Sequence, residues 1–72
     1  MKNKVRIYRK GQGVTQTALA AHLGVSRQTI SAIEQGRYNP GLELAFALAM
    51  AFHTSVEDLF HDEQAADHQL SP

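Results

Sequence analysis

Apolar side chains recur at helical spacing between residues 16 and 36 of this 72-residue chain. Leu19 and Leu23 are four residues apart, and Ile30 and Ile33 are three apart. Because residues three or four positions apart lie on one face of a helix, the pattern predicts two short amphipathic helices that share a buried seam. Gly24 separates the two pairs and can adopt the left-handed conformation that ends a helix. We therefore expect two helices joined by a tight turn.

Helix ends are predicted from capping residues and helix breakers. Thr15, Ser26 and Ser55 carry hydroxyl groups that can accept from free N–H groups at a helix start, and Pro40 suits a first turn. Gly36 suits the position after a helix. These signals place helices at residues 2–10, 16 to about 23, 27 to about 35, 40 to about 53, and 56–60. No segment has a convincing strand pattern, so the expected fold class is all-α with five helices.

The helical part of the chain is expected to form one domain at residues 1–61. A chain of 72 residues is close to the lower limit for a self-sufficient core. Beyond residue 61 the apolar period is lost, and residues 62–72 are expected to form a flexible tail. The side chains assigned to the core are Ile30, Ile33, Leu42, Leu48, Phe52, Val56, Leu59 and Phe60.

The predicted fourth helix is unusually apolar. Residues 44–52, LAFALAMAF, are nine apolar residues in a row. A helix that is apolar all round needs cover on more than one side, and the core of so small a domain covers only one. Phe46, Ala47 and Met50 are therefore candidates for a subunit interface. The alternative is that the alanines make a tolerable, weakly apolar surface.

The formal net charge of zero conceals a strong asymmetry. All seven Lys and Arg residues lie within residues 1–37, where Glu34 is the one acid, which gives 7 − 1 = +6. Residues 41–72 contain six acids and no Lys or Arg. The asymmetry indicates a basic face for nucleic acid and an acidic end kept away from it, although two solvated halves would give the same count.

Metal binding, catalysis and membrane insertion are not indicated. The four histidines, at positions 22, 53, 61 and 68, lack the spacing of three to five residues that a compact zinc site on one helix needs, and the chain has no cysteine. The acids at positions 57, 58, 62 and 63 have no glycine-rich loop nearby, so we expect no enzyme and no cofactor. Without a signal peptide or an 18-residue apolar run, the expected location is the cytoplasm.

Residues 15–40, TQTALAAHLGVSRQTISAIEQGRYNP, resemble the helix-turn-helix of the Cro and phage-repressor type, the xenobiotic-response-element-like (XRE-like) family. The resemblance extends over about residues 4–60 and is closest to small stand-alone bacterial regulators. It implies a five-helix lambda-repressor-like domain that binds double-stranded DNA, with helices two and three forming the helix-turn-helix.

The resemblance also implies roles for single residues. Gln16 would donate to a DNA phosphate, while Arg27 and Gln28 would enter the major groove, where Arg suits guanine and Gln suits adenine. A hydrogen bond between Gln16 and Gln28 would fix both side chains. The remaining residues expected at phosphates or nearby base edges are Ser26, Thr29, Ser31, Arg37, Tyr38 and Asn39.

Arg9 and Glu34 match a family ion pair that ties the first helix to the end of the third, and we interpret it as structural.

Two positions depart from the family pattern. Ala32 stands where several relatives place a polar base-reading side chain, which leaves only an apolar contact with a thymine methyl group. Ile7 occupies a usually polar position and is expected to be an exposed isoleucine.

The function expected is that of a sequence-specific transcriptional regulator, a repressor that binds a palindromic operator as a homodimer. One alternative keeps the fold: an antitoxin that binds a partner protein through its apolar and acidic half and represses its own operon. The other is a protein-interaction module that has lost DNA affinity. A chain that is monomeric by itself would favour the antitoxin, and weak, sequence-blind DNA binding would favour the interaction module.

Overall fold

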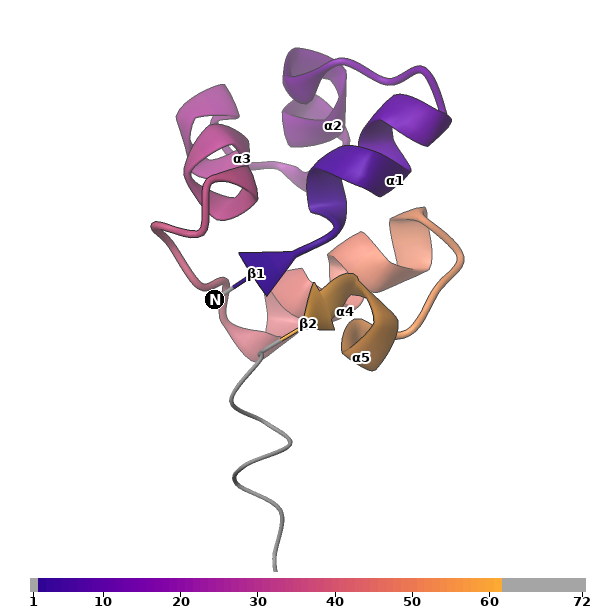
Figure 1. The fold of residues 1–72 in the computed structure, drawn as a ribbon. Coiled ribbons are helices and arrows are strands. Elements are labelled where there is room, and N and C mark those ends of the chain that lie inside the picture. Colours follow the sequence, from indigo (N-terminus) through magenta and orange to yellow (C-terminus); the bar gives the residue numbers. More distant parts are fainter. Residues whose placement is uncertain (1, 62–72) are drawn as a thin grey trace, which may run out of the picture.

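The computed structural model describes residues 2–61. Along the chain its elements are β1 (Lys2–Asn3), α1 (Val5–Gly11), α2 (Gln16–Leu23), α3 (Arg27–Glu34), α4 (Leu42–Ala51), α5 (Val56–Leu59) and β2 (Phe60–His61) (Figure 1). The predicted helical fold class, with five helices in this part of the chain, is confirmed. The predicted tail at 62–72, together with His68, Asp62 and Glu63, lies outside the described residues. No helix within residues 2–61 is long and apolar enough to cross a membrane.

The helices form two groups around one core. In Figure 1, α1, α2 and α3 lie above α4 and α5, and the short β1–β2 ribbon lies between the groups. The predicted seam is confirmed, because Leu19, Ile30 and Ile33 are buried where α2 packs on α3. The full set of buried core side chains is Val5, Leu19, Ala20, Ile30, Ile33, Leu48, Ala49, Phe52 and Leu59.

The chain start differs from the prediction, because residues 2 and 3 form a strand and not the first turn of a helix. Lys2 pairs with His61 and Asn3 with Phe60 in an antiparallel ribbon, so the predicted fifth helix also stops one residue early, at Leu59. The Asn3 side chain explains the change. Its Oδ1 accepts from the Val5 amide at 3.1 Å, and its Nδ2 donates to the Ile33 carbonyl at 2.7 Å. A side-chain amide that bonds to nearby backbone competes with helix formation.

The fourth helix also starts later than predicted. Gly41 is its N-cap, and α4 spans Leu42–Ala51, so Pro40 remains outside it. The assignment of Leu42 to the core is wrong: its side chain is 69% exposed. Leu42 is the first residue of α4 and borders an open hollow with Pro40 and Phe60, beyond the edge of the core.

Helices α1 to α4 all end in the same left-handed turn. After α2, the Gly24 and Val25 amides donate to the carbonyls of residues 21 and 20, at 3.3 and 3.0 Å. These paired bonds are those of the Schellman motif, which satisfies the last carbonyls of a helix. The residues with positive φ in the four turns are Gly13 (69°), Gly24 (73°), Gly36 (76°) and His53 (55°). His53 thus occupies a position that glycine occupies in the other three.

Replacing His53 with glycine is expected to raise the free energy of unfolding by about 0.5–1 kcal/mol. A left-handed residue with a Cβ costs about 1–2 kcal/mol, and the greater freedom of glycine in the unfolded chain offsets about half of that gain. Urea unfolding measures the change. His22→Gly is the matched control, because His22 is an exposed residue in the last turn of α2, where glycine should destabilise by about 0.5 kcal/mol. A loss of stability in His53→Gly would contradict the argument.

Candidate nucleic-acid interface

Helix α3 presents a polar edge from its first turn. The Ser26 hydroxyl accepts from the Thr29 amide at 3.1 Å, which confirms the predicted N-cap. Arg27 and Gln28 follow directly and are exposed, while Thr29 and Ser31 are half-buried. The opposite face of the helix is buried in the core through Ile30 and Ile33. The hydrophobic seam therefore fixes which side chains of α3 face outward.

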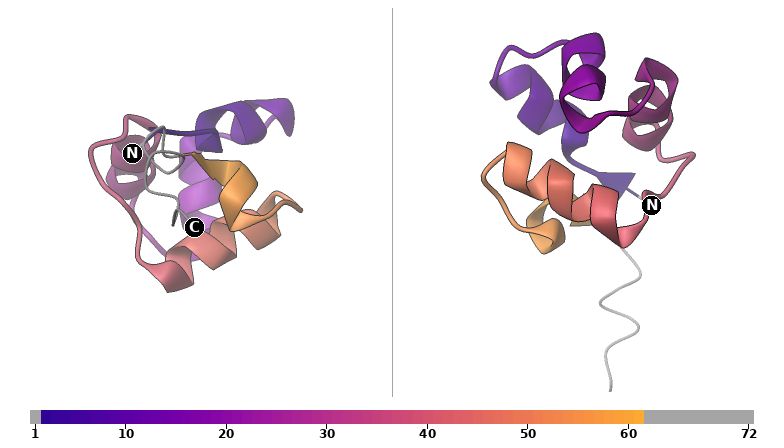
Figure 2. Two further views of the ribbon diagram at one scale, coloured as in Figure 1. Left: turned by 60° about the horizontal axis from the view of Figure 1, so that its bottom comes forward. Right: turned by 180° about the vertical axis from the view of Figure 1, so that it is seen from behind.

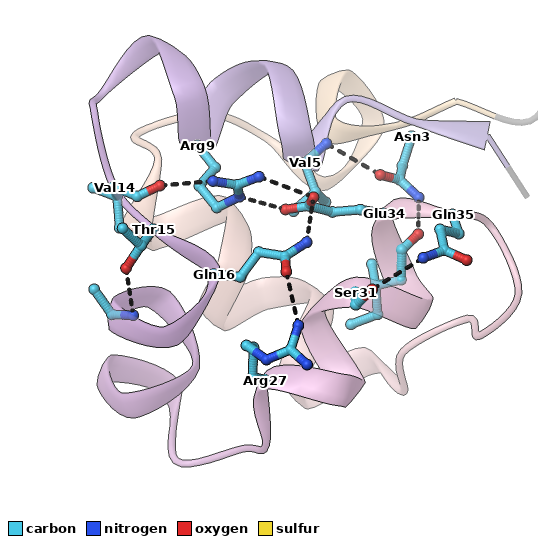
Figure 3. Close-up of polar contacts among 12 residues, drawn as sticks. Asn3, Val5, Arg9, Val14, Thr15, Gln16, Arg27, Ser31, Glu34 and Gln35 are labelled. Atoms are coloured by element: carbon cyan, nitrogen blue, oxygen red, sulfur yellow. Dashed lines mark hydrogen bonds and ion pairs between the residues drawn. The ribbon is translucent and has the colours of Figure 1, made fainter.

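Gln16, the first residue of α2, connects the two ends of α3. Its Nε2 donates to Glu34 Oε1 at 3.1 Å, and its Oε1 accepts from Arg27 Nη1 at 3.3 Å (Figure 3). Both ends of the Gln16 amide are engaged by these partners, and among the side-chain hydrogen bonds of residues 2–61 none joins Gln16 to Gln28 as predicted. Arg27 is thereby held toward the N-terminus of α2.

A buried ion pair lies behind this amide. Arg9 Nε donates to Glu34 Oε2 at 2.6 Å, and Arg9 Nη2 donates to Glu34 Oε1 at 3.1 Å. Arg9 Nη1 donates to the Val14 carbonyl at 2.8 Å, just before α2 begins. The side chains of Arg9 and Glu34 are only 10% and 4% exposed. This pair joins α1, the turn before α2, and the end of α3 (Figure 3).

The pair shifts both ionisation equilibria toward the charged forms. Burial raises the pKa of Glu34, but the hydrogen bonds from Arg9 and Gln16 and the charges of Arg9 and Arg6 outweigh it, so the pKa lies below its ordinary value. The hydrogen bond to Glu34 raises the pKa of Arg9 despite the opposing effect of burial. Glu34 therefore carries a full negative charge that Arg9 neutralises locally.

The loop after α3 supplies the remaining predicted residues. Arg37, Tyr38 and Asn39 are all exposed, and the Arg37 and Tyr38 amides donate to the Ala32 carbonyl at 3.0 and 3.3 Å. The loop is thus anchored to α3 by its backbone while its side chains remain at the surface.

Ile7, on α1, is 68% exposed, as the sequence predicts.

Sequence reasoning missed the connections between these residues. The Glu34–Gln16–Arg27 chain of bonds and the contact of Asn3 with the Ile33 carbonyl join residues 11 to 30 positions apart, and no local spacing marks them. The exposed edge is rich in donors, and its nearest carboxylate, Glu34, is neutralised. Such a surface suits a polyanion. Within residues 2–61, no group of three or more His, Asp or Glu residues could hold a metal ion.

Comparison with known proteins agrees with this geometry. A helix-turn-helix family model matches residues 5–59. An HTH-type transcriptional regulator of Methanocaldococcus jannaschii is 55% identical over 60 residues, which cover 83% of this chain and 91% of the relative. The HTH-type regulator YgzD of Bacillus subtilis is 45% identical over 64 residues, covering 89% and 97% of the two chains. A regulator of Methanothermobacter thermautotrophicus is 48% identical over 61 residues, covering 83% and 88%.

Proposed function

This chain belongs to the helix-turn-helix family of the Cro and phage-repressor, XRE-like type, and we propose that it is a sequence-specific repressor that binds a palindromic operator as a homodimer. The observation that carries the proposal is the exposed start of α3, with Arg27 held in place by Gln16. The protein acts by occupying DNA in the cytoplasm and needs no catalysis or cofactor for that task.

Base readout is assigned to the first turn of α3. Arg27 presents a planar guanidinium that can donate to both O6 and N7 of guanine, and Gln28 can bond both N6 and N7 of adenine. Phosphate contacts carry no sequence information but fix the register of the helix in the groove. We assign that task to Gln16 and to the neighbouring donors Ser26, Thr29, Ser31, Arg37, Tyr38 and Asn39.

The dimer surface is assigned to the outer face of α4. Phe46 and Met50 are 52% and 76% exposed, Ala47 is half-buried, and Leu42 extends the same stripe at a spacing of four residues. Helix α4 lies in the lower group, below α2 and α3 in this view, and packs against α2 with its other side (Figure 2, right). A two-fold dimer places two recognition helices about 34 Å apart, one helical turn of DNA, and a palindromic operator mirrors that symmetry.

Arg27→Ala is expected to cost about 1–3 kcal/mol of binding free energy at one base pair of the operator and to relax the preference there. The operator is first obtained by binding-site selection from random duplexes. Gel-shift titrations on this selected operator and its single-base variants, at one fixed salt concentration, then measure the effect. Arg37→Ala is the matched control, because a phosphate ligand should weaken binding equally on all sequences. If Arg27→Ala also weakened every sequence equally, Arg27 would be a phosphate ligand and not a base reader.

Met50→Glu is expected to convert a dimer to a monomer, because it places a charge on the most exposed residue of the apolar stripe. Sedimentation over a wide range of protein concentrations measures the mass, and Ile7→Glu, at an equally exposed apolar residue on α1, serves as the control. A wild-type chain that stays monomeric at all concentrations would contradict the homodimer. Tight operator binding that then required a second protein would favour the antitoxin.

A further inference from the structure

A hollow of about 340 Å³ opens between α1 and α3, beside the predicted recognition surface. Its floor is the buried Arg9–Glu34 pair, and its walls come from three helices. The residues of the walls are Arg6 and Lys10 of α1, Gln16 of α2, Ser31 of α3, and Gln35, the C-cap of α3. The hollow therefore joins the basic first helix to the polar edge of α3.

The walls of this hollow carry uncompensated positive charge. Arg6 and Lys10 are four residues apart on one exposed face of α1. Glu34 is the one carboxylate among the residues that line the hollow, and both its oxygens accept hydrogen bonds from Arg9. The charge of Arg6 also reaches this carboxylate, since it contributes to lowering the pKa of Glu34. With Arg9 and Glu34 cancelling, the charges of Arg6 and Lys10 remain.

The wall contributed by α3 adds a neutral donor. Gln35 Nε2 donates to Ser31 Oγ at 3.0 Å, so the hydroxyl already has a donor to one of its lone pairs and can direct its own proton outward. Ser31 and Gln35 follow Arg27 at steps of four residues, which places them along one ridge of α3. The hollow thus lies beside the ridge that begins with the assigned base reader.

We propose that this hollow binds a backbone phosphate of DNA, with Arg6 and Lys10 as its cationic ligands. The inference rests on the proposed function, because α3 must dock in the groove to bring the backbone there. Two long, flexible cations set to the side of the recognition helix suit the phosphate backbone and not a base edge, and such contacts set register and affinity without reading sequence. Helix α1 then takes part in the DNA interface, beyond the helix-turn-helix.

The test is the salt dependence of DNA binding by Arg6→Gln, by Lys10→Gln and by the double variant. Dissociation constants are measured across a salt series on the selected operator and on an unrelated duplex. The logarithm of the association constant decreases linearly with the logarithm of the salt concentration, and each phosphate contact contributes about 0.9 to the magnitude of that slope. Because one phosphate is bound, we expect the magnitude of the slope to fall by about 0.9 for the double variant and by less for each single variant, with equal fold-losses on both duplexes.

Lys4→Gln is the matched control. It removes the same charge from the N-cap of α1, an exposed lysine that does not line the hollow. Its slope should stay within about 0.3 of the wild-type slope, because a phosphate contact is worth about 0.9. Circular dichroism checks that all variants remain folded.

The outcomes separate this inference from the proposed function. A slope for the double variant equal to that of Lys4→Gln overturns the phosphate site, as does a loss confined to one base pair of the operator. Wild-type protein that binds all duplexes equally overturns sequence-specific regulation, but the slopes on the unrelated duplex still test the hollow. Wild-type protein that binds no duplex at all overturns both.

Discussion

Replacing Glu34 with alanine is expected to lower the free energy of unfolding by about 3–5 kcal/mol. The change leaves the Arg9 guanidinium, only 10% exposed, without its partner, and a buried charge without a partner is strongly destabilising. Urea unfolding at neutral pH measures the loss. The control is Glu43→Ala: this acid is exposed in the first turn of α4, and its loss should cost less than about 1 kcal/mol.

A double variant tests the cause of that loss. If the penalty comes from the unpaired guanidinium, then Arg9→Met combined with Glu34→Leu should recover most of the stability, because apolar pairs of similar volume often replace buried ion pairs without loss. A single-variant loss below about 1 kcal/mol would contradict a stabilising role for the pair. A double variant no more stable than Glu34→Ala would contradict the explanation by the unpaired charge.

The same pair predicts a dependence of stability on pH. The pKa of Glu34 is lower in the folded state, so in acid the unfolded chain binds more protons at this residue. The free energy of unfolding therefore decreases as the pH is lowered. The stabilisation by Glu34 is complete at pH values above the pKa of an unfolded glutamate, about 4.3. It is lost as the pH falls through the lower pKa that Glu34 has in the folded state. Glu34→Gln, which cannot titrate, should show a weaker decline over that window.

Phe52→Ala is expected to lower the free energy of unfolding by about 3–5 kcal/mol, the usual cost of truncating a buried aromatic side chain. Phe52 is 4% exposed, and its ring stacks on Tyr8 with the centroids 5.8 Å apart. It therefore joins the end of α4 to α1 across the two groups of helices. The loss should take up a large part of the total stability of a domain this small, and thermal or urea unfolding measures it.

The control for Phe52→Ala is Ile7→Ala, because Ile7 is 68% exposed and its truncation should stay within about 0.5 kcal/mol. A double-mutant cycle with Tyr8→Leu should give a coupling energy of about 0.5–1.5 kcal/mol for the stacked rings. Equal losses for Phe52→Ala and Ile7→Ala would contradict the assignment of Phe52 to the core.

The sequence predicts those features of this fold that depend on near neighbours. Thr15, Ser26 and Ser55 all cap helices by accepting from the amide three residues on, as their hydroxyl groups predict. Gly24 takes the left-handed turn for the same local reason. Features that depend on contacts between residues far apart in the sequence were either not predicted or predicted wrongly. The β1–β2 ribbon joins opposite ends of the described chain with two residues on each side, too few to show an alternating pattern.

Exposure of a predicted core residue has a similar cause. Nearly every residue of α4 is apolar, so the sequence does not mark which face is buried. Leu42 lies four residues from Phe46 on the exposed stripe, whereas Ala45, Leu48 and Ala49 form the buried face. At the site, the exposed positions of Arg27 and Gln28 follow from the buried seam opposite them. The partners of Gln16 could not be predicted in this way, because only the packing of α1, α2 and α3 brings Arg9, Gln16 and Glu34 together. Contacts of these residues with DNA remain predictions.

The Glu34–Gln16–Arg27 chain of bonds divides the recognition turn into a constrained position and an adaptable one. Any substitution at Arg27 leaves Gln16 Oε1 without that donor. Because the same Gln16 amide also donates to Glu34, the substitution is expected to disturb the Arg9–Glu34 ion pair as well. Gln28 is exposed, and no side-chain hydrogen bond ties it to another described residue. New operator preferences should therefore arise more readily by changes at Gln28, where a different side chain alters what is read without disturbing what holds the domain folded.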